Sequence, residues 1–240
     1  MNNKSEFNRG IHDGLPICLG YLSVSFAFGI FAVGNGLSGI EAILISMTTV
    51  TSAGQLAGVP IIASGGSLIE LAVTQLIINL RYALMSISLS QKLDNSISMA
   101  DRFLISFVNT DEVFAVASGN KSVNKKYMYG LILTPYIGWS FGTALGVIAG
   151  NILPAIVISA LGIAIYGMFI AIIIPQAKKS IKTALCILTA AAMSFAFKYL
   201  PFLKNVSSGF VIIICAVSAS ALFAIIFPIE NNDKKGNADD

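Results

Sequence analysis

Three charged residues lie deep inside apolar stretches of this sequence: Arg81, Asp111 and Glu112. A charge in the hydrocarbon of a bilayer is costly, so ionisable residues there pair with one another or mark a transport path. A guanidinium can hold a carboxylate, and a carboxyl group beside a second one can bind and release a proton. These residues therefore predict zwitterion binding or proton coupling. The alternative is a static ion pair that fixes how two helices meet.

The composition indicates that these charges belong to a membrane protein. The 240-residue chain is 55% hydrophobic and 11% charged, with a mean hydropathy of +0.80, whereas soluble domains carry about 25% charged residues. Glu41 and Glu70 are the only charges between Gly14 and Leu80. This pattern excludes a soluble enzyme and a disordered or collagen-like chain. It predicts an all-α, polytopic transmembrane helical bundle.

Division of the apolar stretches into lengths of about 20 residues predicts seven to eight membrane segments. The organisation is then an N-terminal cytoplasmic segment 1–13, a transmembrane transport domain 14–229 and a polar, disordered tail 230–240. A broken helix near the second or fourth segment stays open, because Asn109 could cap a second half-helix. The segments lie at about 15–34, 40–62, 67–91, 101–120, 127–149, 153–175, 183–200 and 206–228.

The loop charges predict the orientation. Eight crossings with both termini in the cytoplasm obey the positive-inside rule. If the fourth segment does not cross, three lysines change sides and the bias weakens. In the eight-crossing arrangement the outer cations are Lys92, Arg102, Lys198 and Lys204, and the inner ones are Lys4, Arg9, Lys121, Lys125, Lys126, Lys178, Lys179, Lys182, Lys234 and Lys235.

The spacing of the charges predicts that they meet. Arg81 precedes Lys92 by 11 residues and Asp111 follows Arg102 by 9, so both lie near mid-bilayer at about 1.5 Å per residue. The short connection between their segments makes the two helices antiparallel neighbours. Arg81 should therefore pair with Asp111 or Glu112. Adjacent residues on a helix point about 100° apart, so both carboxylates cannot face Arg81 equally.

Two other intramembrane charges have a structural explanation. Ser38-Gly-Ile-Glu41 and Ser67-Leu-Ile-Glu70 match the capping box that begins a helix. Ser98-Met-Ala-Asp101 predicts a similar start for the fourth segment.

The second and third segments add polar candidates. Between Thr48 and Pro60, hydroxyls stand with Gln55 and two glycines, of which Gly54 precedes the glutamine. A loosened helix here would free backbone groups for a carboxylate or an ammonium; a kinked packing helix is the alternative. Asn79 could line the same cavity. Glycines at every fourth position allow close helix packing, namely Gly138, Gly142 and Gly146.

Several classes of function lack support in the sequence. The single histidine precedes the first apolar stretch and the three cysteines are far apart, so no metal or cofactor site is expected. A net charge of +3 without a basic, aromatic-rich stretch gives no support for nucleic-acid binding. An intramembrane enzyme would need a nucleophile with a base, so we expect no enzyme. A channel or a non-transporting assembly subunit stays the alternative to a transporter.

An internal repeat is weakly indicated. A shift of 113 residues places Gly29 on Gly142, Ser46 on Ser159 and Gly54 on Gly167. Duplicated halves are common in transporters.

In the order and spacing of these elements the whole chain resembles the AzlC family, the large subunit of branched-chain amino acid exporters. The elements are Gly14-Leu15-Pro16, Ser52-Ala53-Gly54-Gln55, Asn79-Leu80-Arg81-Tyr82 and Asp111-Glu112. The resemblance implies a multi-pass secondary exporter of leucine, isoleucine, valine or methionine in the bacterial inner membrane. It also implies a small membrane partner of the AzlD type.

The expected mechanism is alternating access driven by protons, with the amino acid bound at mid-membrane. Substrate binding is expected at Gly54, Gln55, Asn79 and Arg81. Proton coupling or ion pairing is expected at Asp111 and Glu112, with Arg81 as the partner.

Overall fold

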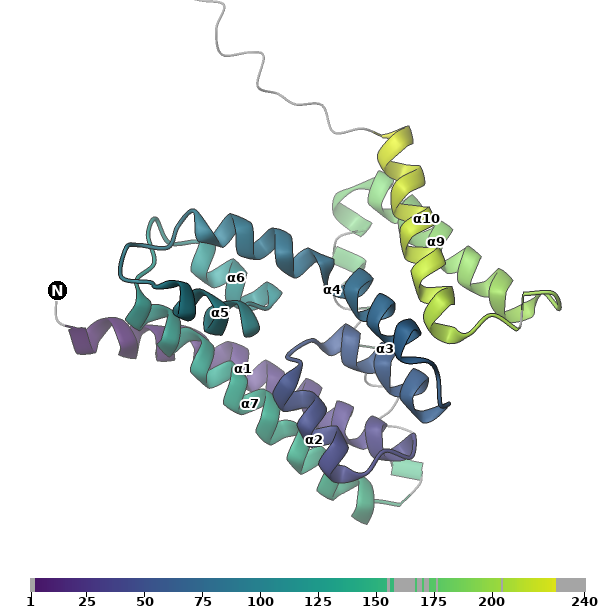
Figure 1. The fold of residues 1–240 in the computed structure, drawn as a ribbon, viewed down its shortest axis with the longest axis horizontal. Coiled ribbons are helices and arrows are strands. Elements are labelled where there is room, and N and C mark those ends of the chain that lie inside the picture. The colour runs from purple at the N-terminus through teal and green to yellow at the C-terminus, as the bar shows by residue number, and fades with distance from the viewer. Residues whose placement is uncertain are drawn as a thin grey trace, which may run out of the picture. The chain divides into compact units, whose positions relative to one another are not determined.

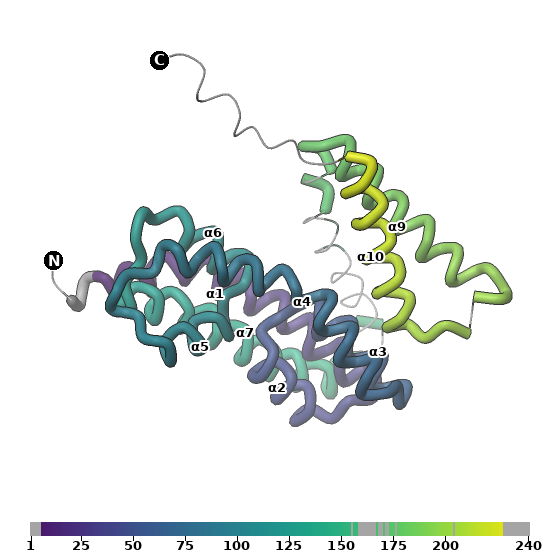
Figure 2. Tube along the Cα trace, turned by 45° about the horizontal axis from the view of Figure 1, so that its top comes forward, coloured from purple at the N-terminus to yellow at the C-terminus, as the bar shows by residue number. Residues whose placement is uncertain are grey.

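The structure, a computed structural model, describes residues 3–154, 156–157, 167, 170, 173–175, 177–203 and 205–227. Within these residues every regular element is a helix, which confirms the all-α prediction. The chain divides into two compact units, Met1–Met168 and Phe169–Asp240. Figures 1 and 2 show the helices of each unit.

Among the described residues, five helices are long and apolar enough to cross a membrane. They are α1 (Asn3–Gly34), α4 (Leu68–Ser90) and α7 (Lys125–Ile152) of the first unit, and α9 (Ile181–Tyr199) and α10 (Ser208–Ile226) of the second. The predicted N-terminal segment continues into α1 without a break. Most of the predicted segment at 153–175 and the whole tail 230–240 lie outside the described residues.

In the first unit, α1 and α7 lie side by side and run in the same direction (Figure 1). A Cβ atom on Gly10 would lie 2.2 Å from the backbone oxygen of Tyr127, and one on Gly146 would lie 2.1 Å from that of Phe26. Residues early in α1 thus contact residues early in α7, and later residues contact later ones, as expected for two parallel helices. The predicted packing role of the α7 glycines is confirmed, since only residues without a side chain permit such a close approach.

The second and fourth predicted segments are both broken, as the sequence left open. The second consists of α2 (Gly39–Thr48) and α3 (Ser52–Ala63), and the fourth of α5 (Met99–Phe107) and α6 (Asp111–Ser118). With 8 to 12 residues each, these helices are about 12–18 Å long. Each therefore covers only about half of a bilayer core of about 30 Å.

The pair α5–α6 turns back on itself. Its first turn and its end lie at the same level, because Asp101 Oδ1 is 2.8 Å from Lys125 Nζ and Lys92 donates a hydrogen bond to the carbonyl of Ser118. The loops before and after the pair are joined by backbone hydrogen bonds between Lys92, Asp94 and Val123. The predicted crossing by the fourth segment is therefore wrong.

The pair α2–α3 also turns back, from the other end of the unit. Thr51, just before α3, donates a hydrogen bond to Asn79 in the middle of α4. Further along α3, a Cβ atom on Gly58 would lie 3.4 Å from Leu71, near the start of α4. Thus α3 runs antiparallel to α4, back to the end at which α2 begins. The predicted crossing by the second segment is wrong as well.

These two reversals change the distribution of charge. The first turns of α1, the loop 91–98 and the loop 119–124 lie together; for example, Arg9 bonds Asn120. We call this end of the unit the basic end. Apart from Arg81, every lysine and arginine of residues 3–154 belongs to it, namely Lys4, Arg9, Lys92, Arg102, Lys121, Lys125 and Lys126. The positive charges of the loops therefore stay on one side although the fourth segment does not cross. The reason is that the second segment, α2–α3, does not cross either, and the two missing crossings cancel.

The predicted helix starts are confirmed. Ser38 with Glu41 and Ser98 with Asp101 form complete capping boxes before α2 and α5. Ser67 accepts a hydrogen bond from the backbone N–H of Glu70 before α4.

In the second unit, α9 and α10 lie side by side. They are antiparallel, because Lys182 at the start of α9 lies 5.0 Å from the ring of Phe227, which follows α10.

Candidate functional site

The tips of the two hairpins meet beside the middle of α4. One tip is the Thr49–Thr51 turn between α2 and α3, and the other is the Val108–Thr110 turn between α5 and α6. They enclose a cavity of about 170 Å³, which we call the tip cavity. Its lining residues are Thr48, Thr49, Val50, Thr51, Asn79, Tyr82, Ser106, Phe107, Asn109 and Thr110.

Two helix N-termini lie at this cavity, those of α3 and α6. Neither Thr51 nor Thr110 caps its helix with a side-chain hydrogen bond. The Thr51 hydroxyl instead donates to Asn79 Oδ1 at 2.7 Å. Unpaired N–H groups and the helix dipole make such N-termini favourable for an anion. The cavity thus combines a largely apolar wall with polar side chains and two helix N-termini that could receive a carboxylate.

Arg81 and Asp111 form the predicted ion pair, with 2.6 Å between Nη1 and Oδ2. Arg81 also donates a hydrogen bond to Tyr82 Oη at 3.3 Å. The side chains of Arg81 and Asp111 are 46% and 44% exposed on the first unit. A pair so exposed would be unfavourable against lipid. It requires a further covering surface or a water-filled path.

Glu112 has a different partner, Tyr21 on α1. Tyr21 Oη also lies 2.5 Å from Thr110 Oγ1. A phenol has one proton, so Tyr21 donates to the carboxylate and can accept from the threonine hydroxyl. The two adjacent carboxylates thus point to different helices, as their 100° separation predicts.

Gln55 belongs to the scaffold and does not line the tip cavity. Its side chain is 3% exposed. Gln55 Nε2 donates to Ser46 Oγ at 2.8 Å and its Oε1 accepts from Trp139 Nε1 at 3.1 Å. Ser46 in turn bonds Thr143 at 2.7 Å. This buried network joins α2, α3 and α7, so the hydrogen-bonding groups of Gln55 are already paired within the protein.

Gly54 also lies at a helix contact. A Cβ atom on it would lie 2.5 Å from Gln75 Oε1, and its carbonyl accepts a hydrogen bond from Gln75. It allows α3 to approach α4, and it does not line the tip cavity. Asn79, by contrast, lines the tip cavity as predicted.

Sequence reasoning missed several residues at the site. Tyr21 and Tyr82 are single tyrosines in apolar stretches, and no spacing singles them out. In the sequence, the site was indicated only by the polar residues at 48–52 and at Asn109–Glu112. The cap of α6 is Thr110, whereas the predicted cap, Asn109, donates to Ser86 Oγ at 3.2 Å.

Comparison with known proteins agrees with a membrane protein. The family model of the AzlC protein matches residues 16–153, more than half of the chain. A membrane protein of Archaeoglobus fulgidus is 33% identical over 83% of this chain and 88% of its own length. Inner membrane protein YgaZ of Escherichia coli is 30% identical over 80% and 81%, respectively.

A more distant membrane protein of Helicobacter pylori is 24% identical over 61% of this chain and 67% of its own length. No solved structure matches the chain significantly. The matched region contains both hairpins, α4, all of α7 and the part of α1 from Pro16 onward. The chain is therefore a membrane protein that belongs to the AzlC family.

Proposed function

We propose that this protein is a secondary active transporter that exports branched-chain or related amino acids across the bacterial inner membrane. The observation that carries the proposal is the meeting of two hairpin tips from opposite ends around a cavity that contains hydroxyl and amide side chains. Helices interrupted at mid-membrane, with their N-termini facing the substrate, are a recurrent construction in secondary transporters.

The residues of the site take distinct roles in this proposal. The N-termini of α3 and α6 bind the substrate carboxylate. Asn79 and the threonine hydroxyls provide further hydrogen bonds. Asp111 and Glu112 hold the ammonium group or the coupling proton, and Arg81 keeps Asp111 charged when the substrate is absent. Alternating access then consists of movements that open the tip cavity to one end and then the other.

The charge distribution of the first unit supports an orientation with the N-terminus in the cytoplasm. Positively charged loops remain on the cytoplasmic side, and the basic end carries all the lysines and arginines of residues 3–154 except Arg81. In this orientation α2–α3 enters from the outer side and α5–α6 from the cytoplasmic side.

A small subunit of the AzlD type is the proposed partner. The exposed Arg81–Asp111 pair supports this, because a covering protein surface would shield it from lipid. Copurification of the full chain with this subunit, and leucine transport with and without it, test the proposal. Equal transport by the chain alone would contradict a requirement for the partner.

The decisive experiment is leucine counterflow in proteoliposomes. Arg81→Gln, Asp111→Asn and Glu112→Gln should each reduce counterflow at least tenfold, about 1.4 kcal/mol in the barrier, while the protein still inserts. Lys121→Gln is the matched control, because this exposed cation lies in a loop of the basic end. Full transport by all three site variants would contradict the proposal. Conductance that does not saturate would indicate a channel instead.

An exchanged pair separates coupling from a static role. The double variant Arg81→Asp with Asp111→Arg keeps an ion pair at the same place. If the pair only fixes the helices, transport should return with it. We expect transport to remain lost, because the exchanged carboxylate would then stand on α4 and not at the N-terminus of α6.

A further inference from the structure

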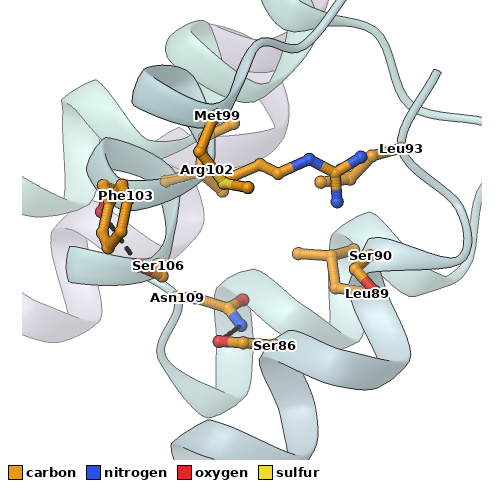
Figure 3. Close-up of a pocket in the computed structure, with 10 residues that line it drawn as sticks. Ser86, Leu89, Ser90, Leu93, Met99, Arg102, Phe103, Ser106 and Asn109 are labelled. Carbon is orange, nitrogen blue, oxygen red and sulfur yellow. Dashed lines mark hydrogen bonds between the residues drawn. The ribbon is translucent and has the colours of Figure 1, made fainter. Parts of the chain in front are cut away.

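A second cavity lies between α4 and α5, on the side of the basic end (Figure 3). It has a volume of about 190 Å³ and apolar walls. We call it the α4–α5 cavity. Its polar lining consists of three serines, one arginine and one asparagine: Ser86, Ser90, Ser106, Arg102 and Asn109.

Arg102 is the charged group of this cavity, and its side chain extends across it in Figure 3. Three other cations of the basic end have partners: Lys125 pairs with Asp101, Arg9 pairs with Glu6 and Lys92 donates a hydrogen bond to Ser118. Arg102 has no ion-pair or hydrogen-bond partner among the described residues. A guanidinium with five free N–H donors is suited to a carboxylate.

Asn109 lies at the inner end of the cavity, and its residue is 2% exposed. Its amide nitrogen donates to Ser86, whereas its Oδ1 atom is buried and has no hydrogen-bond partner among the described residues. Figure 3 shows this oxygen on the cavity side of the amide. A buried acceptor without a donor is costly, and a donor from a ligand would satisfy it.

The two cavities are adjacent, because Asn109 and Ser106 line both. The α4–α5 cavity thus leads from Arg102, in the first turns of α5, to the tips at mid-length. Seven residues separate Arg102 from Asn109, about 10 Å along the chain of helical residues. The two polar residues therefore stand at successive positions along the cavity.

We infer that the α4–α5 cavity is the access path by which an α-amino acid zwitterion reaches the tip cavity from the basic end. Arg102 first binds its carboxylate, the apolar wall accommodates its side chain, and Asn109 Oδ1 then accepts from its ammonium group. This inference rests on the proposed function. It adds the route by which the substrate enters, the end of the unit from which it enters, and the contacts with Arg102 and Asn109.

Thiol reactivity in vesicles that expose the basic end tests the path without requiring transport. The full chain, with its partner subunit and with Cys18, Cys186 and Cys215 replaced, carries Ser106→Cys. An anionic methanethiosulfonate should modify this thiol about fivefold faster than a cationic one, because a fixed positive charge attracts anions locally. Arg102→Gln should remove this preference, and Arg102→Lys should keep it. Ser122→Cys, in an exposed loop of the same end, is the control that Arg102→Gln should leave unchanged.

Ligand protection identifies the chemical class. Leucine should slow the modification of the Ser106→Cys variant, and leucinol, which lacks the carboxylate, should not. Asn109→Asp retains an acceptor oxygen and should retain protection, whereas Asn109→Leu should lose it.

The outcomes separate the path from the function. Equal rates for both reagents, or no protection by leucine in a chain that shows leucine counterflow, would overturn the path and leave the proposed function intact. Charge preference without protection, in a chain that shows no counterflow of any amino acid, would overturn the proposed function and the substrate of the path with it.

Discussion

At the residue scale, the polar groups of the first unit separate into a scaffold and a site. The buried amide of Gln55 has a hydrogen-bond partner for both its nitrogen and its oxygen, and these hydrogen bonds hold helices together. Arg81, Asp111 and Glu112 do not line the tip cavity; they neighbour the lining residues Tyr82 and Thr110 in the chain and are partly accessible. Polar residues with similar sequence contexts thus differ in role because of the partners that the fold brings to them.

Tyr21 provides a test at this scale. Tyr21→Phe removes the hydroxyl that joins Thr110 and Glu112 to α1. The loss of a buried hydrogen bond costs about 1–3 kcal/mol, so the variant should unfold at a lower temperature in detergent and transport leucine more slowly. Tyr199→Phe is the control, because Tyr199 is 63% exposed. An unchanged melting temperature for Tyr21→Phe would show that this contact does not stabilise the fold.

At the element scale, α1 and α4 are each followed by a hairpin of two short helices. The hairpins depend on extended residues at their turns, with φ of −137° at Thr49 and −143° at Thr51. Extended residues end the helical hydrogen bonding and allow the chain to reverse. The Asp101–Lys125 pair and the capping box at Ser98 fix where α5 begins. These contacts at the start of α5 fix the base of the α5–α6 hairpin and thereby the position of its tip.

The close packing of α1 on α7 should make the stability of the protein sensitive to the size of residue 146. Gly146→Ala would place a Cβ atom 2.1 Å from the Phe26 carbonyl oxygen and force the helices apart. We expect a loss of folded protein, measured as a lower yield of monodisperse protein and a lower melting temperature. Gly20→Ala is the matched control, since no atom lies within 4 Å of a Cβ on that α1 glycine. Equal stability of the two variants would contradict the packing role.

At the scale of the whole molecule, α1 with α2–α3 and α4 with α5–α6 follow the same order in opposite directions. A long helix is followed in each by a hairpin that turns back at mid-length. This is an inverted arrangement, and it places the two tips against each other. The repeat suggested by the 113-residue shift is a different one; it relates the chain to positions that include Ser159, which lies outside the described residues.

The two reversals make a prediction about topology. In a cysteine-free background, Asn95→Cys and Lys121→Cys should react with an impermeant thiol reagent from one side of the membrane, and Asn35→Cys and Ser64→Cys from the other. The reason is that the loops 91–98 and 119–124 lie together at the basic end. Eight crossings would instead place Asn95 and Lys121 on opposite sides. That labelling result would contradict the two hairpins.

The sequence by itself determined the class of protein, the helix starts and the depth of the charges. Scarce charge can be accommodated only in a membrane, capping boxes act within four residues, and depth follows from the rise of a helix. The Arg81–Asp111 pair was predictable for this reason, because the two residues stand at similar distances from a short connection.

Only the tertiary structure decided which segments turn back, and which polar residues face a cavity. An apolar stretch of about 20 residues has the same composition whether it crosses or reverses, and a reversal depends on contacts such as Thr51 with Asn79. The role of Gln55 depends on Trp139, 84 residues away, and that of Glu112 on Tyr21, 91 residues away. No local pattern encodes such partners, since the packing of α1 on α7 and of the hairpins on α4 brings them together.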